Sequence, residues 1–190
     1  MRDPTRSRRF DAIKAGDHFA LFGLERTFDL DVAALEKAFL ENSRKLHPDK
    51  QLTVQSDEPL PRRQQRALAL SAAMNQAYAI LKDRTKRAEY LLKLLGGKTA
   101  EQDRRTPPGL LEEMLEKREL VAESSPDARE KLVALLQELE NREKETEGRL
   151  SALFRAGDTS QIRLELNALK YVTNLIDELR KTLPTWNSKS

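Results

Sequence analysis

Apolar residues recur at helical spacing along this chain, in runs separated by proline or glycine. Leu35, Phe39 and Leu46 form one such run, with Ala38 and Asn42 on the same side of the expected helix. No segment alternates apolar and polar residues as a half-buried strand does. The abundance of Ala, Leu, Glu, Lys, Arg and Gln also favours helix. The sequence therefore predicts an all-α protein.

Prolines, glycines and capping residues predict where the helices begin and end. One or two helical turns are expected within 18–24. A long helix should follow an N-cap at Asp29 to Asp31 and should stop before Pro48. Further helices are expected at 63–81, 84–95, 109–123, 127–156 and 158–182. The expected inward residues of the first two of these are Leu68, Ala72, Asn75, Tyr78 and Leu81, then Ala88, Leu91, Leu92 and Leu95.

The same breaks predict two domains. Short loops at Ser125-Pro126 and Gly157-Asp158 favour antiparallel neighbours, so the last three helices should form a bundle. Asp158 followed by Gln161 resembles a capping box. The expected divisions are a basic flexible tail at 1–16, a helical domain at 17–96, a linker at 97–108, a three-helix bundle at 109–183 and a C-terminal tail at 184–190.

Composition excludes several kinds of site. The chain has no cysteine, which excludes disulfides, thiolate metal sites and cysteine nucleophiles, and only two histidines, which argues against a polyhistidine zinc site. No apolar run is long enough to span a membrane and no secretory signal is recognisable. We therefore expect a protein of a reducing compartment that has no metal, no cofactor and no membrane association.

No enzyme motif is present either. The sequence lacks a glycine-rich phosphate loop, a G-x-S-x-G motif and an H-E-x-x-H motif. Acidic residues such as Glu143 and Glu147 recur at helical spacings, which is typical of a solvated helix face rather than a catalytic carboxylate pair. The sequence thus predicts a protein that is not an enzyme.

Charge is distributed unevenly along the chain. The net charge is +3, with +3 in residues 1–9, +3 in residues 10–106 and −3 in residues 107–190. The basic N-terminus is typical of a solvated tail, with a weak nucleic-acid contact as the alternative. Among residues 1–10 only Phe10 could stack on a base, so binding to nucleic acid is the less favoured interpretation.

The tripeptide His47-Pro48-Asp49 follows the first long helix, at the expected tip of a helical hairpin. Pro48 fixes its own backbone angle and makes a rigid kink, which would hold His47 and Asp49 outward. Asp49 could then accept a bidentate pair from an arginine of a partner. The neighbouring basic residues favour docking on an acidic surface; they are Lys37, Arg44, Lys45 and Lys50.

With this motif, residues 17–96 resemble a J-domain, the module that stimulates the ATPase of heat-shock-70 chaperones. The resemblance also rests on Phe19 to Leu24, on the helix that ends at Leu46 and on the run Asn75-Gln76-Ala77-Tyr78. It implies that Asp49 engages the nucleotide domain and linker of the chaperone. It also implies that Arg44 and Lys45 steer the docking.

After residues 84–95 the chain has neither a Gly/Phe-rich linker nor a cysteine-rich domain. It has instead an apolar and acidic run from Leu110 to Glu119 and, later, the tripeptide Leu169-Lys170-Tyr171. This arrangement resembles the HscB-type co-chaperones of iron–sulfur cluster assembly over residues 17–183. The resemblance implies that the bundle binds an iron–sulfur scaffold protein (IscU-like). The matching scaffold-binding positions are Leu111, Leu115 and Tyr171, with Leu110 and Met114 nearby and Glu116 and Glu119 as charged flanks.

The function implied is delivery of the scaffold to a specialised heat-shock-70 chaperone (HscA-like) by an L-shaped protein. We expect the protein itself to bind no cluster, because it has no cysteine. Two departures from the bacterial pattern are Glu112, where an apolar residue is common, and Tyr171, where Phe is common. Three alternatives stay open: a different client, a core role for the patch residues, and the mitochondrial matrix in place of the bacterial cytoplasm.

Overall fold

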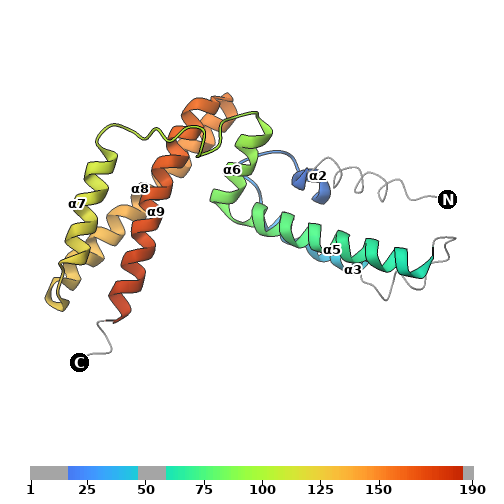
Figure 1. The fold of residues 1–190 in the computed structure, drawn as a ribbon, viewed down its shortest axis with the longest axis horizontal. Helices are drawn as coiled ribbons and strands as arrows, with labels where there is room; N and C mark the ends of the chain where they lie inside the picture. Colours follow the sequence, from blue (N-terminus) through green and yellow to red (C-terminus); the bar gives the residue numbers. More distant parts are fainter. Residues whose placement is uncertain (1–16, 47–58, 186–190) are drawn as a thin grey trace. The chain divides into compact units, whose positions relative to one another are not determined.

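The computed structural model describes residues 17–46 and 59–185, and every regular element within those residues is a helix (Figure 1). The chain divides into two compact units, residues 1–91 and residues 92–190. In the described part of the chain, no helix has both the length and the apolar character needed to cross a membrane. The prediction of an all-α protein is confirmed.

The first unit contains α2 (His18–Phe22), α3 (Val32–Leu46), α5 (Leu60–Lys82) and most of α6 (Arg84–Leu94). Helices α3 and α5 pack against each other, and α2 packs against both. Asp31 caps α3, because its carboxylate accepts the backbone N–H of Ala33 at 2.9 Å. The predicted N-cap of this helix is therefore confirmed at one of its candidate residues.

The buried face of α5 differs from the predicted one. Leu81 is fully buried, but Leu68 is 73% exposed and both Ala72 and Asn75 lie at the surface. This part of the prediction was wrong because α5 has Ala or Leu on several faces, so spacing alone does not select the inward one. The apolar residues that α5 buries are Ala67, Leu70, Met74, Ala77 and Leu81.

Helix α6 buries Ala88, Leu91 and Leu92 as predicted, whereas Leu95 is 47% exposed. Leu95 lies just past the end of the helix and precedes Gly96, which has φ +75° and therefore turns the chain away. Burial of an arginine in α6 was not predicted. Arg87 is 2% exposed and donates from Nε to the carbonyl oxygen of Phe28 at 3.0 Å, which satisfies its buried charge in part.

The second unit contains α7 (Leu110–Ala122), the 3-10 turn Pro126–Ala128, α8 (Arg129–Ala156) and α9 (Thr159–Thr185). Asp158 caps α9 by accepting the backbone N–H of Gln161 at 3.0 Å, so the predicted capping interaction is confirmed. Gly157 ends α8 with φ +73°, a conformation that favours glycine. Helix α9 packs against both α7 and α8.

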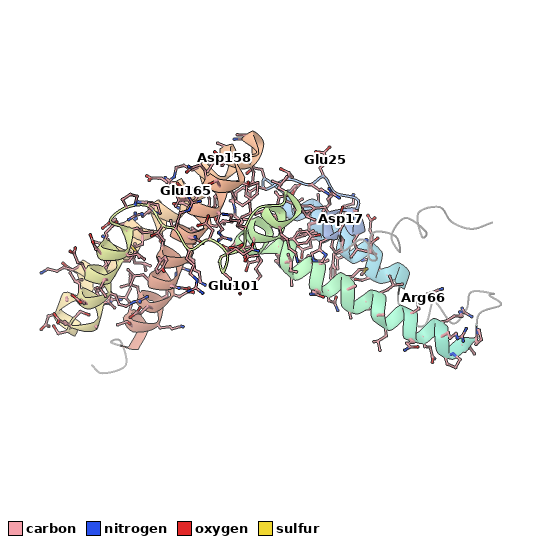
Figure 2. The ribbon with its side chains drawn as sticks, turned by 45° about the horizontal axis from the view of Figure 1, so that its top comes forward. Asp17, Glu25, Arg66, Glu101, Asp158 and Glu165 are labelled. Atoms are coloured by element: carbon pink, nitrogen blue, oxygen red, sulfur yellow. The ribbon has the colours of Figure 1, made fainter. Side chains whose placement is uncertain are left out.

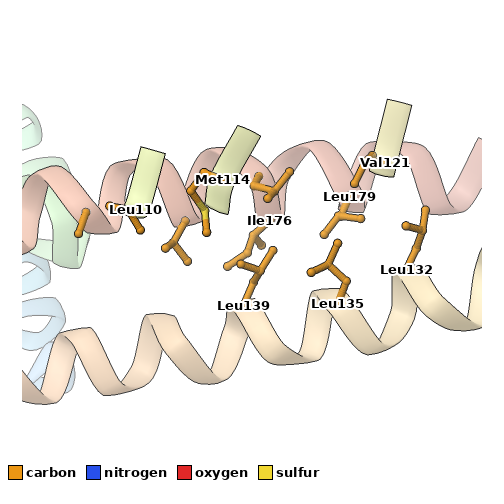
Figure 3. Packing of buried hydrophobic residues seen from close by; sticks show 11 residues of the cluster. Leu110, Met114, Val121, Leu132, Leu135, Leu139, Ile176 and Leu179 are labelled. Carbon is orange, nitrogen blue, oxygen red and sulfur yellow. The ribbon is translucent and has the colours of Figure 1, made fainter. Parts of the chain in front are cut away.

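Apolar side chains from all three long helices form the core of the bundle (Figure 3). Leu132, Leu139 and Leu179 have no exposed surface, so truncation of any of them to Ala should cost about 2–5 kcal/mol. This core extends along the full length of α7. Its members are Leu110, Met114, Val121, Leu132, Leu135, Leu139, Ala168, Val172, Leu175, Ile176 and Leu179.

Candidate partner-binding surfaces

The first candidate surface is the outer face of α3. Lys37 and Arg44 are both exposed and are seven residues apart, so they lie on the same face about two turns apart. Glu41 is also exposed and lies between them, which reduces the positive charge of this face. The side chain of Lys45 and all of His47, Pro48, Asp49 and Lys50 lie outside the described residues.

The opposite face of α3 is held by the rest of the first unit. Leu35 is fully buried, and the ring of Phe39 stacks on Tyr78 of α5 with centroids 4.3 Å apart. Asn42 is 2% exposed, and its side-chain amide lies 3.5 Å from the carbonyl oxygen of Leu21. These contacts fix the rotation of α3 and thereby turn Lys37 and Arg44 outward.

The second candidate surface consists of Leu111, Leu115 and Tyr171, and we call it the apolar patch. Their exposed fractions are 49%, 58% and 38%. A core role for these three residues, which the sequence left open, is excluded by this exposure. Large exposed apolar side chains from two helices are typical of a protein-binding surface.

Two of the residues grouped with this patch do not lie on the surface. Leu110 is 1% exposed and Met114 is 6% exposed, and both belong to the bundle core (Figure 3). The reason is helical geometry, because residues 110 and 114 share one face of α7 and residues 111 and 115 share the next. Leu110 and Met114, which the resemblance placed near the patch and among the scaffold-binding positions, therefore lie beneath it in the core, and their expected role in direct contact with a scaffold is corrected.

Ion pairs hold α7 on both sides. On one side Arg118 donates from Nε to Glu178 of α9 at 3.1 Å. On the other side Glu113 accepts from Arg142 at 2.6 Å, and this guanidinium lowers the pKa of Glu113. These contacts leave Leu111 and Leu115 on the exposed side of α7 next to α9, the helix that contains Tyr171.

Acidic residues border the apolar patch along α7. Glu112, Glu116 and Glu119 are all exposed. They lie on the side of the helix away from the core, where a docked partner could contact them. This edge of the patch has a negative charge that would favour basic residues on a docked protein.

The segment predicted as a linker packs on the bundle. The side-chain amide of Asn167 in α9 donates to the carbonyl oxygens of Asp103, at 2.9 Å, and of Arg105, at 2.7 Å. Arg105 also forms a two-point ion pair with the Asp103 carboxylate, with a shortest distance of 2.6 Å, and this pair lowers the pKa of Asp103 to about 2. The segment lies in the same compact unit as the bundle.

Sequence reasoning missed two basic side chains beside Tyr171. Arg104 from this segment and Lys170 from α9 line a pocket that Tyr171 also lines. Arg104 appears in the sequence only within the charged run Asp103-Arg104-Arg105, and Lys170 only within Leu169-Lys170-Tyr171, and neither run indicates that the two cations lie beside one pocket. In the described part of the chain, no group of three or more His, Asp or Glu side chains is arranged to hold a metal ion.

Comparison with known proteins agrees with this architecture. The family model for the HSCB C-terminal oligomerisation domain matches residues 106–180. The co-chaperone protein HscB homolog of Cupriavidus taiwanensis is 33% identical over 161 residues, which cover 84% of this chain and 89% of that protein. The homolog of Bordetella pertussis is 31% identical over 172 residues, which cover 90% and 98% respectively.

Solved structures give the same result. Chaperone HscB from Vibrio cholerae superposes with a TM-score of 0.73 and 27% identity over 88% of this chain and 98% of that one. Human co-chaperone protein HscB superposes with a TM-score of 0.71 and 26% identity over 96% of this chain and 85% of that one. The relatives are described as co-chaperones, not as enzymes. The chain belongs to the HscB family of co-chaperones.

Proposed function

We propose that this protein binds an iron–sulfur cluster scaffold protein through the apolar patch, delivers it to a heat-shock-70 chaperone and stimulates the ATPase of that chaperone. The observation that carries the proposal is the exposure of Leu111, Leu115 and Tyr171 above a bundle core that is complete without them. Membership of the HscB family supports the assignment of a partner protein to this surface.

The chaperone-binding half of the proposal rests on different residues. His47-Pro48-Asp49 lies outside the described residues, so its support is the motif itself and its position after α3. Lys37 and Arg44, exposed on the outer face of α3, supply positive charge that would attract an acidic surface of the chaperone. Because both partners bind one chain, each raises the effective concentration of the other. We place this activity in the bacterial cytoplasm.

Scaffold binding can be tested by calorimetry with the full chain and a purified scaffold protein. Replacing Leu111 and Leu115 together by Ala should weaken binding by about 2–4 kcal/mol, as truncation of central interface residues does. The matched control is Leu120→Ala, because Leu120 is 50% exposed on α7 but points away from Leu111. Equal affinities for the double variant and the control would contradict the proposal.

A further inference from the structure

A pocket of about 360 Å³ adjoins the apolar patch at Tyr171. One wall is the segment before α7 and the other is α9 (Figure 2 labels Glu101 on that segment). Most of the side chains that line it can donate hydrogen bonds. The lining side chains that matter here are Glu101, Arg104, Asn167, Lys170, Tyr171 and Asn174.

The two neighbouring arginines of this segment have different surroundings. The guanidinium of Arg105 already has partners within the chain. It donates to both carboxylate oxygens of Asp103, and it donates to the hydroxyl of Ser160 at 3.2 Å. Arg104 faces the pocket instead. Neither Arg104 nor Lys170 forms an ion pair with any side chain in the part of the chain that the structure describes. Both charges are therefore available to a ligand.

The backbone at Arg104 is fixed in place. Asn167 donates to the carbonyl oxygen on each side of this residue, that of Asp103 and that of Arg105. One α9 side chain thus holds the wall from which Arg104 extends, while Lys170 extends from α9 itself. A backbone segment that is held before binding loses less conformational entropy when a partner docks.

The charges around the apolar patch differ on its two sides. The α7 side has exposed Glu112, Glu116 and Glu119, whereas the pocket has two cations and one carboxylate, Glu101. A partner that covers the patch would meet a negative edge along α7 and a positive pocket beside Tyr171. Such opposite edges would fix the orientation of the partner.

We propose that the pocket formed by Arg104, Lys170 and Asn174 binds a carboxylate of the scaffold protein that docks on the apolar patch. This proposal rests on the proposed function, since it assigns the chemistry of the same partner. A guanidinium can bind a carboxylate through two parallel hydrogen bonds, and an ammonium and an amide can supply further donors. Continuity through Tyr171, which lines the pocket and belongs to the patch, places both contacts under one docked protein.

The test is a series of scaffold titrations with the full chain at low and at high salt. Replacing Arg104 and Lys170 together by Glu should weaken binding roughly tenfold at low salt and by less at high salt, because two attractions become repulsions that salt screens. The matched control is Lys181→Glu, an exposed lysine on the same helix about three turns further on. This control should change the affinity by less than about twofold.

A charge swap then identifies the partner group. Each Asp or Glu of the scaffold is replaced by Lys, and one such variant should regain affinity for the chain with Glu at positions 104 and 170. Unchanged binding by the double variant would overturn the carboxylate proposal and leave the proposed function standing, whereas failure of the unaltered chain to bind any scaffold would remove both. Inorganic phosphate is titrated into the unaltered chain and the double variant as a second probe. If the double variant loses phosphate binding but binds the scaffold as the unaltered chain does, the pocket is a site for a free anion and the proposal is overturned.

Discussion

Arg118 of α7 and Glu178 of α9 form an ion pair, with Nε of Arg118 3.1 Å from a carboxylate oxygen of Glu178. Leu111 precedes Arg118 by seven residues and Tyr171 precedes Glu178 by the same number. Helices α7 and α9 run in the same direction in the bundle (Figure 1). Leu111 and Tyr171 therefore lie at the same level, about two helical turns from the ion pair.

Reversing the charges of this ion pair tests whether it helps to set the alignment of α7 along α9. Arg118→Glu should lower the free energy of unfolding by up to about 1 kcal/mol, because both side chains are substantially exposed, and adding Glu178→Arg should restore it. Chemical denaturation of both single variants and the double variant measures the coupling energy. A coupling energy of zero would mean that packing alone sets the register of α7 on α9.

Truncation of a core leucine on α7 should lower the stability of the protein much more than truncation of a patch leucine. Leu110→Ala should cost about 2–5 kcal/mol of stability, because Leu110 is 1% exposed. Leu115→Ala should change stability by less than about 0.5 kcal/mol, because Leu115 is 58% exposed. Thermal or urea unfolding distinguishes the two, and a large loss of stability in Leu115→Ala would place that residue in the core after all.

Asn167 should contribute to stability through the segment it holds. Asn167→Ala would leave two carbonyl oxygens without their donor, at a cost of about 1–3 kcal/mol. Hydrogen exchange should also accelerate in residues 99–105, while exchange in the middle of α8 stays unchanged. Exchange that accelerates uniformly across the bundle would show that Asn167 acts on the fold as a whole and not on this segment.

Asp103 should make the stability depend on pH in acid. Arg105 lowers the pKa of Asp103 from its ordinary value of 3.8 to about 2, so the contribution of the ion pair is complete above pH 3.8 and is lost as the pH falls through about 2. Stability should therefore fall between these two values, and Asp103→Asn should remove this part of the dependence. NMR titration of the Asp103 carboxyl carbon checks the pKa directly, and a midpoint at or above 3.8 would contradict the ion pair.

Helix positions followed from sequence because their signals are local. Asp31 and Asp158 were identified as capping candidates from residues within one turn of each. The inward face of α5 could not be identified in this way, since Leu68 and Leu70 are both apolar and only the packing of α2 and α3 decides between them. Rotation of a helix about its own axis depends on its neighbours, which spacing does not describe.

Residue spacing was also insufficient to identify the exposed face of α7 at the candidate site. On α7 the pairs formed by Leu110 with Met114 and by Leu111 with Leu115 have the same spacing, so the pattern alone allows either pair to face the core. The resemblance to a family selected the second pair as the patch, and the structure shows that this pair is the exposed one. Arg104 was missed because its neighbour Lys170 lies far away in sequence.

The central claim is that one chain couples a scaffold protein to the ATPase of a heat-shock-70 chaperone. The most direct measurement is single-turnover ATP hydrolysis by the cognate chaperone, with this protein added alone, with the scaffold added alone and with both present. We predict the largest increase in rate when both are present, and none when Asp49→Asn replaces the unaltered chain. No increase with the unaltered chain and the scaffold together would contradict the account.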